Sequence, residues 1–279
     1  MLENGVHFGH KASRWNPKMK KYIYTKNSGI HIIDLNHTAD LFSDALNFIH
    51  SQIVEGKTIL MVANKPQAAE ILVEYASVLN VPYVVNRWLG GTLTNFTTIK
   101  KRIRHYKDLE TKLASNDMER YTKKEKSVFQ KEYEKLDKTF RGIRDLVALP
   151  DMIFVTDVNH DMIAVIEAIK VGIPVVGFAD TNVDPLLLNY PIPANDDAPK
   201  SLRYLLGVIN EVILDAKKNQ KKKEEEVEVS DDAIKVIVTE DVVLEKEGGE
   251  GARSAVPGIK GNPKALGKVA LKSKKPMKK

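Results

Sequence analysis

The sequence predicts an α/β protein with a Rossmann-like, doubly wound, mainly parallel five-stranded sheet and an inserted antiparallel coiled-coil helical hairpin. Two stretches, residues 57–86 and 150–180, each read as strand, helix, strand. Their strands are continuous apolar runs, which is typical of strands covered on both faces in a parallel sheet. Between these two units lies a long segment without any strand-like run, and this segment predicts the hairpin.

The remaining elements of the sheet domain follow from periodicity and from helix-ending residues. A short β-like run at 29–35 precedes an amphipathic helix over 36–56, which Gly56 ends. Pro66 suits the first turn of the next helix, and Gly172 ends the helix of the second unit. The prolines of YPIPAN, residues 190–195, suit a fifth strand at an edge of the sheet. A last helix places these side chains inward: Leu202, Leu205, Leu206, Ile209 and Ile213.

The hairpin is predicted by apolar residues spaced by three or four. The first helix carries Phe96, Ile99, Ile103, Tyr106, Leu109 and Leu113 on one face, and the second carries Phe129, Tyr133, Leu136, Phe140, Ile143 and Val147. The segment SNDME, residues 115–119, reads as the turn between them. Thr122 and Glu125 have the spacing of a capping box at the start of the second helix.

This reading divides the chain into three parts. Residues 1–93 and 148–220 form the α/β globular domain, and residues 94–147 form the inserted hairpin. Residues 221–279 are a low-complexity tail that changes from acidic to basic. It has too few apolar residues to fold alone, so we expect it to be largely disordered.

Composition limits the partners. The chain has 279 residues, a formal net charge of +6 and a pI of about 9.1. A basic balance favours polyanions, above all nucleic acid, although simple solubility would also explain it. Cysteine is absent, which excludes disulfides and thiolate sites. No signal-like segment opens the chain and its apolar runs are too short for a bilayer, so we expect a cytoplasmic protein without membrane contact.

A doubly wound sheet suggests a nucleotide enzyme, but the sequence lacks the necessary loops. The turns after the first strand of each unit, NKPQAAE and DVNHD, contain no glycine, and no G-x-G-x-x-G or Walker A motif occurs. Gly90 and Gly91 could present N–H groups to a phosphate, yet a structural turn is the favoured reading. The histidines form no catalytic set, so we expect no catalytic residue. A Rossmann-type enzyme that acts on a nucleotide or small anion remains an alternative to a binding protein. A coiled-coil adaptor is the third hypothesis.

Acidic residues follow the last two predicted strands. Asp180 and Asp184 come after one strand, and Asp196 and Asp197 come after the next. Carboxylates at the carboxyl edge of a sheet could hold a divalent cation through oxygen ligands. Capping of the following turns and helix is the favoured reading. A structural metal held by Asp184, Asp196 and Asp197 is kept as the second hypothesis.

Basic residues and aromatic rings are concentrated near the start of the chain. The stretch at 5–24, GVHFGHKASRWNPKMKKYIY, contains no acid. Cations neutralise phosphates and rings can stack on unpaired bases, so this pattern favours RNA. The alternative is that Trp15 is buried in the core and the lysines are merely solvated. A second basic region lies near the base of the hairpin. The predicted RNA-binding residues are His10, Lys11, Arg14, Trp15, Asn16, Lys18, Lys20, Lys21, Arg87, Lys100, Lys101, Arg102, Arg104, Arg141 and Arg144.

Several blocks occur in an order that resembles one family. They are GVHFGH, RWNPKM, YIY, GIHIIDL, RWLGGTLTNF, GIRDLVALPD, GIPVVGFADTNVDP and YPIPANDDA, together with the helical insertion. Over about residues 2–218 the chain resembles the bacterial family of small-subunit ribosomal protein two.

The resemblance implies a structural component of the small ribosomal subunit that binds 16S rRNA near the junction of head and body. It implies neighbouring ribosomal proteins as partners and a role in docking the large mRNA-binding protein of that subunit. It also implies a ribosome-bound cytoplasmic location without a homo-oligomer. Metal has been associated with acids that match those at the carboxyl edge.

Overall fold

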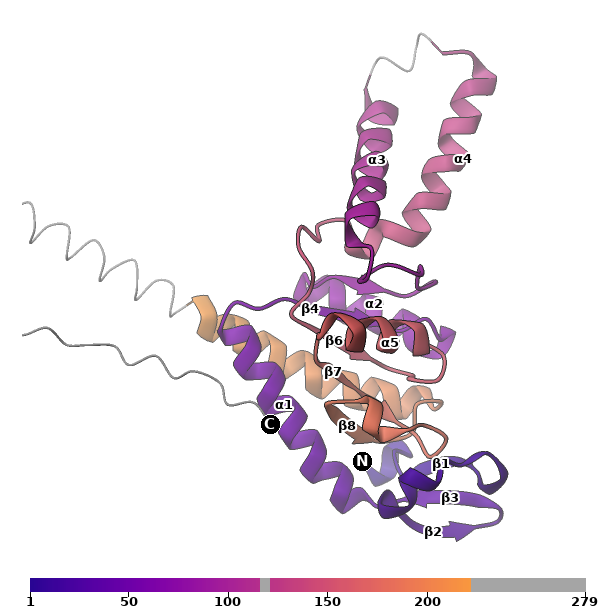
Figure 1. Cartoon of the computed structure of the whole chain (residues 1–279), viewed down its shortest axis with the longest axis vertical. Helices are drawn as coiled ribbons and strands as arrows, with labels where there is room; N and C mark the ends of the chain where they lie inside the picture. Colours follow the sequence, from indigo (N-terminus) through magenta and orange to yellow (C-terminus); the bar gives the residue numbers. More distant parts are fainter. Residues whose placement is uncertain (116–120, 222–279) are drawn as a thin grey trace, which may run out of the picture. The chain divides into compact units, whose positions relative to one another are not determined.

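The computed structural model describes residues 1–115 and 121–221 of the chain (Figure 1). The predicted turn at 115–119, apart from Ser115, and the predicted tail, apart from Lys221, lie outside these residues. A five-stranded parallel sheet forms the centre, in the order β5-β4-β6-β7-β8. Its strands are β4 (Ile59–Val62), β5 (Tyr83–Val84), β6 (Met152–Val155), β7 (Val175–Ala179) and β8 (Tyr190–Pro193).

This order makes the sheet doubly wound. Numbered along the chain, the strands lie 2-1-3-4-5, which is the flavodoxin-like order, with its topological switch point between β4 and β6. All four strand pairs are parallel. The proline-containing strand β8 lies at one edge, as predicted, and the predicted fold class is confirmed.

Each strand contributes side chains to two separate cores, because successive residues point to opposite faces. On one face Met61 and Phe154 pack under α1 (Leu35–Val54), α2 (Pro66–Leu79) and a final helix over 199–221. On the other face Leu60 and Val155 pack under α5 (Met162–Val171), which lies in front of the strands in Figure 1. Burial on both faces explains why these strands are continuous apolar runs.

The helix ends follow the expected local rules. Asp34 caps α1 by accepting a hydrogen bond from the Asn36 N–H, and Pro66 occupies the first turn of α2. Gly172 ends α5 in the left-handed region, with φ of 81°.

A small antiparallel sheet near the N-terminus was not predicted. It comprises β1 (Phe8–Lys11), β2 (Ile23–Asn27) and β3 (Ile30–Ile33), in the order β1-β3-β2. Only the run that contains β3 was expected to be a strand. The other two strands are short and polar, and most of their side chains are partly or fully exposed, so they lack the apolar pattern that identifies a strand.

Two antiparallel helices, α3 (Phe96–Ala114) and α4 (Lys123–Phe140), form the predicted hairpin. The Tyr106 ring stacks on Tyr133 at 5.5 Å, and the Tyr106 hydroxyl donates to Asp137. The predicted capping box of Thr122 and Glu125 is confirmed. The prediction that the second helix continues to Val147 is wrong, because a 3-10 turn, η5 (Arg141–Ile143), follows α4 directly.

This turn brings the hairpin base against the edge of the central sheet. A Cβ added to Gly142 would lie 2.1 Å from the Tyr83 carbonyl oxygen of β5, so only glycine allows this approach. The backbone at Gly142 therefore covers part of the free edge of β5 and fixes the point at which the hairpin leaves the domain.

Gly142→Ala should destabilise the protein by about 1–3 kcal/mol, because the added methyl group meets backbone that cannot rotate away. Urea unfolding monitored by circular dichroism measures the loss. Gly90→Ala is the matched control, since an added Cβ there meets nothing within 4 Å. Equal stability of the two variants would show that β5 and the hairpin base do not pack this closely.

Candidate nucleic-acid interface

The basic N-terminal segment lies over the carboxyl end of β7. The backbone N–H of His10 donates to the Thr181 hydroxyl at 2.9 Å, and the N–H of Asn16 donates to the Thr181 carbonyl at 2.7 Å. Gly9 lies close to the same residue: a Cβ added to Gly9 would lie 2.5 Å from the Thr181 methyl carbon. These contacts join residues about 170 positions apart in the chain, and they fix the segment to the α/β domain.

The cations of this segment divide into one that has an acidic partner and four that have none among the described residues. The Lys18 ammonium pairs with the Asp184 carboxylate at 2.5 Å. Asn16 accepts a hydrogen bond from the Lys18 N–H and so caps η3 (Pro17–Tyr22). The other four side chains are exposed and have no acidic partner among the described residues: Lys11, Arg14, Lys20 and Lys21.

The aromatic side chains of the segment differ in exposure. Trp15 is 37% exposed, and its ring lies 5.3 Å from that of His31. Tyr22 is only 5% exposed, and the Lys21 ammonium lies 4.5 Å from the centre of its ring. Trp15 is therefore partly accessible to a nucleotide, whereas Tyr22 belongs to the core.

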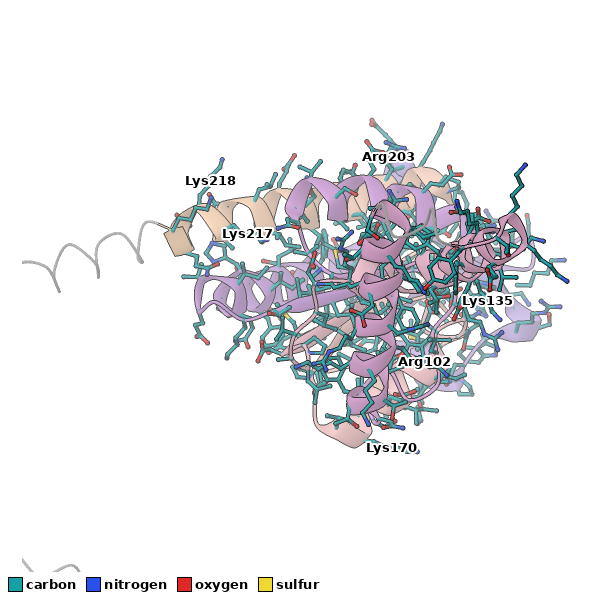
Figure 2. The ribbon with its side chains drawn as sticks, turned by 90° about the horizontal axis from the view of Figure 1, so that it is seen from above. Arg102, Lys135, Lys170, Arg203, Lys217 and Lys218 are labelled. Carbon is teal, nitrogen blue, oxygen red and sulfur yellow. The ribbon has the colours of Figure 1, made fainter. Side chains whose placement is uncertain are left out.

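The second predicted basic region lies on the hairpin and beside it. Arg144 makes two contacts of 2.9 Å with Glu110, and the Lys100 ammonium donates to the Val147 carbonyl. These two residues therefore join the segment after η5 to α3. The remaining side chains are exposed and have no acidic partner among the residues that the structure describes: Arg87, Lys101, Arg102, Arg104 and Arg141. Figure 2 shows Arg102 on α3 and Lys135 on α4.

Side chains of the protein itself occupy the carboxyl edge of the sheet near its switch point. The Lys65 ammonium lies 3.0 Å from Asp157, 3.2 Å from Asp196 and 2.5 Å from Asp197. Burial by itself lowers the pKa of Lys65, but the three carboxylates outweigh it and raise the pKa above its usual value. A fixed positive charge thus lies where a doubly wound protein usually binds its ligand.

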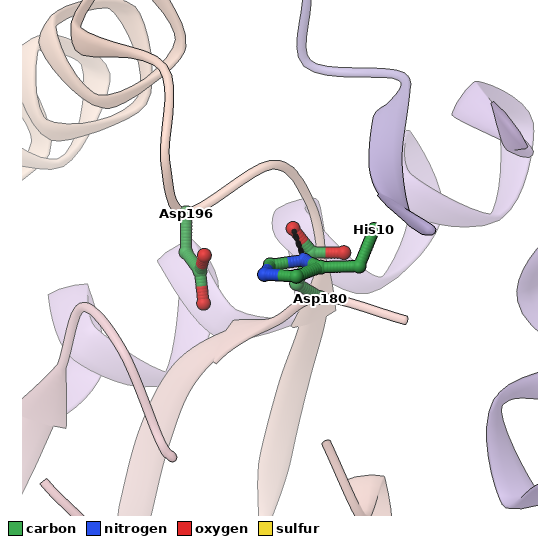
Figure 3. Close-up of side chains that lie close together, drawn as sticks. All are labelled: His10, Asp180 and Asp196. Atoms are coloured by element: carbon green, nitrogen blue, oxygen red, sulfur yellow. Dashed lines mark ion pairs between the residues drawn. The ribbon is translucent and has the colours of Figure 1, made fainter. Parts of the chain in front are cut away.

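Close to Lys65, His10 lies beside the buried carboxylates of Asp180 and Asp196 (Figure 3). His10 Nδ1 lies 3.0 Å from Asp180, and His10 Nε2 lies 3.3 Å from Asp197. The hydrogen bond to Asp180 is the largest cause that raises the pKa of His10 to about 9. Asp196 is 1% exposed, and its pKa is raised by burial first and then by Asp180 and Asp157.

The same cluster offers ligands for a cation. Ligand atoms of His10, Asp180 and Asp196 lie within 4.8 Å of one another. The Oδ2 atom of Asp196 is buried and has no hydrogen-bond partner. One imidazole nitrogen and two carboxylate oxygens are ligands that Zn²⁺ accepts, so these residues fit a divalent metal.

The acidic residues predicted as metal ligands separate in the structure. Asp196 belongs to the cluster and Asp197 borders it, whereas Asp184 pairs with Lys18 and caps η6 (Pro185–Leu187). Asp184 thus has the predicted capping role. Before the final helix that role belongs to Asn195, whose side chain accepts hydrogen bonds from two backbone N–H groups. No backbone N–H among the described residues donates to Asp196 or Asp197 across that turn.

Glu167 is an organising residue that the sequence analysis missed. Its Oε1 accepts hydrogen bonds from Trp88 Nε1 at 3.2 Å and from the Gly91 N–H at 2.7 Å. Its Oε2 accepts from the N–H groups of Leu93 and Thr94 and from the Thr94 hydroxyl. The loop that contains Gly90 and Gly91 thus presents N–H groups to an anion, as its composition allowed. That anion is the Glu167 carboxylate of α5.

A signal for Glu167 and for Lys65 is present in the sequence. Glu167 is the only acidic residue of α5, MIAVIEAIKV, and apolar residues surround it in the sequence. Lys65 follows the first strand where a phosphate loop would begin. A charged residue in an apolar run, such as Glu167, or at a ligand-binding position, such as Lys65, indicates that its side chain has a buried polar partner within the protein.

The chain was compared with known families and proteins. The profile described as "Ribosomal protein S2" matches residues 1–216. The chain belongs to the ribosomal protein S2 family. It is 48% identical over 226 residues to the small ribosomal subunit protein uS2 of Helicobacter hepaticus, covering 81% of this chain and 86% of the relative. It is 46% identical over 235 residues to that of Fusobacterium nucleatum, covering 83% and 95%.

Membership in the S2 family identifies a structural, non-enzymatic protein of the small ribosomal subunit. The enzyme hypothesis is therefore rejected. Among the described residues, no helix combines the length and apolar character that crossing a membrane requires. In this S2 chain the Rossmann-like sheet serves as a scaffold that presents charged segments.

Glu167→Gln should lower the free energy of unfolding by about 2 kcal/mol at pH 7, because an amide NH₂ would replace one of two oxygens that accept from N–H and O–H groups. Burial alone would raise the pKa of Glu167, but the N–H groups of Gly91, Leu93 and Thr94 lower it. A lowered pKa stabilises the fold above about pH 4.5, the ordinary value, and this stabilisation is lost as pH falls through the folded pKa.

Urea unfolding at several pH values tests this. The difference in the free energy of unfolding between wild type and Glu167→Gln should shrink as pH falls below 4.5, the ordinary pKa of a glutamate. Glu211→Gln, at an exposed position of the final helix, is the control. A difference that did not depend on pH would contradict a role for the ionised carboxylate.

Proposed function

We propose that this S2 family member binds 16S rRNA near the junction of head and body of the small subunit, through its N-terminal segment and the hairpin base. The observation that carries the proposal is the set of exposed cations in the N-terminal segment without an acidic partner among the described residues: Lys11, Arg14, Lys20 and Lys21. Unpaired cations on a rigid support attract phosphates and release counterions when they bind.

The anchoring contacts support this proposal further. Thr181 and Asp184 hold the segment against the domain through backbone hydrogen bonds and the Lys18 ion pair. The backbone that carries the exposed cations consequently has little freedom to lose on binding. Exposed cations of the hairpin, Arg102 and Arg104 among them, supply a second contact region.

We further propose that neighbouring ribosomal proteins are the other partners, and that the protein helps to dock the large mRNA-binding protein of the subunit. The family resemblance supports both. Residues 94–147 are proposed to be an insertion in a domain formed by 1–93 and 148–220, and the protein is proposed to act without forming a homo-oligomer.

A triple variant, Arg14→Ala, Lys20→Ala and Lys21→Ala, tests the N-terminal contact. Its occupancy in reconstituted small subunits should fall. For 16S rRNA, the magnitude of the negative slope of log affinity against log salt should become smaller by about 2–3, since each lost phosphate contact contributes about 0.7–0.9. Quantitative mass spectrometry of purified subunits and filter binding across a salt series are the measurements.

The control removes three exposed lysines of the final helix, at Lys200, Lys218 and Lys221. Lys218 is seen on that helix in Figure 2. This variant has the same net charge as the triple variant but keeps the N-terminal segment. If both variants lost affinity equally, the effect would reflect total charge, and the assignment to the N-terminal segment would fail.

We also propose that the cluster of His10, Asp180 and Asp196 holds a structural divalent metal. The buried, unpartnered oxygen of Asp196 supports this, because a bound cation would compensate its burial. Bound metal would connect the N-terminal segment to the carboxyl ends of β7 and β8. It has no part in any reaction, since the protein is not an enzyme.

Titration calorimetry with Zn²⁺ on chelator-treated full-length protein tests the site. One equivalent should bind to wild type, and Asp196→Asn should weaken binding at least tenfold by removing a charged ligand. Asp184→Asn is the matched control and should bind as wild type does, because Asp184 pairs with Lys18 instead. Wild-type affinity in Asp196→Asn would refute the site.

A further inference from the structure

Exposed Phe, Tyr and Trp side chains are confined to one region of the described chain. Three Phe, Tyr or Trp side chains are exposed, namely Phe8, Trp15 and Tyr24, and all three lie within the first 24 residues. Two have a ring partner: Phe8 lies 4.1 Å from His7, and Trp15 lies 5.3 Å from His31. Tyr24 is 75% exposed and has no ring partner among the described residues.

The backbone directs Tyr24 outward. β2 pairs with β3 through Ile23 with Ile33 and then Thr25 with Ile32, so β2 advances two residues where β3 advances one. Tyr24 is therefore the extra residue of a β-bulge on an edge strand. Bulges occur where a strand re-aims a side chain, and the extra residue is left outside the ladder of strand pairs.

The surroundings of Tyr24 are cationic and polar. Between Glu3 and Asp34 the chain has six Lys and Arg residues and no carboxylate. Lys26 is two residues further along the strand, a step of about 6–7 Å. The residues from 25 to 29 are all exposed and none is apolar. A protein partner that buried Tyr24 would also have to bury this polar strand, whereas a nucleotide brings a flat ring together with a phosphate.

We propose that Tyr24 is a base-stacking residue, whose ring packs on an unpaired base of ribosomal RNA while Lys26 and its basic neighbours meet the adjoining phosphates. The inference rests on the proposed rRNA binding of the N-terminal segment and names the part of the RNA that this segment recognises. Stacking uses the π-face that every base has, so the contact selects single-stranded RNA rather than a base sequence.

Stacking and charge neutralisation depend differently on salt, and this difference makes the proposal testable. A phosphate contact adds to the slope of log affinity against log salt, whereas a stacked ring changes affinity without changing the slope. Full-length wild type, Tyr24→Phe, Tyr24→Leu and Tyr24→Ala are compared for binding to 16S rRNA across a salt series. Lys26→Ala is the charge control.

We expect Tyr24→Ala and Tyr24→Leu to weaken binding about tenfold at every salt concentration, with an unchanged slope. Tyr24→Phe keeps the ring and should stay within about twofold of wild type. Lys26→Ala should reduce the magnitude of the negative salt slope by about 0.7–0.9. Because Tyr24 is exposed, thermal unfolding of all four variants should match wild type.

Three outcomes would overturn the proposal, and they can be told apart. If wild type bound rRNA without salt dependence, the proposed function would fail together with this inference. If wild type and the Lys26 variant behaved as expected but Tyr24→Ala bound like wild type, only the stacking role would fail. If Tyr24→Leu bound like wild type while Tyr24→Ala was weak, the contact would be apolar packing and not stacking.

Discussion

The ammonium group of Lys65, set among Asp157, Asp196 and Asp197, is the interaction on which the carboxyl edge of the sheet depends. Parallel strands bring these carboxylates together, where they would repel one another, and burial additionally penalises the charge of Asp196. Lys65 comes from the turn after β4, the position from which related architectures bind a phosphate. A charge from the chain itself thus occupies the position at which a doubly wound sheet usually binds its ligand.

The same carboxyl edge also positions the basic N-terminal segment. His10 faces Asp180 and Asp197, and Lys18 faces Asp184, so the edge holds the segment by its charges as well as through Thr181. An exposed ion pair such as that of Lys18 contributes little by itself. The backbone hydrogen bonds to Thr181 and the His10 contact with a buried carboxylate are therefore the stronger anchors. Carboxylates and cations that look like two separate sites in the sequence form one structural unit.

Local patterns allowed the α/β sheet, the hairpin and most helix ends to be predicted, because each depends on residues within a few positions. The capping box at Thr122 and the stop at Gly172 are examples. The contacts of the site join residues far apart: His10 meets Asp180, and Glu167 meets Gly91. No periodicity encodes such a pairing. The small antiparallel sheet was missed because β1 and β2 are polar, and their strands form only through pairing with β3.

Glu167 and Gly142 together determine how rigidly the hairpin is presented. Glu167 ties the loop from Trp88 to Thr94, immediately before α3, to the helix α5. Gly142, immediately after α4, packs its backbone against β5. Both connections of the hairpin are thereby fixed to the domain through buried contacts. A long helical pair that is held at both ends keeps its cations at fixed positions relative to the domain. A hinged pair would move relative to the domain and would have to lose this freedom of movement on binding a partner.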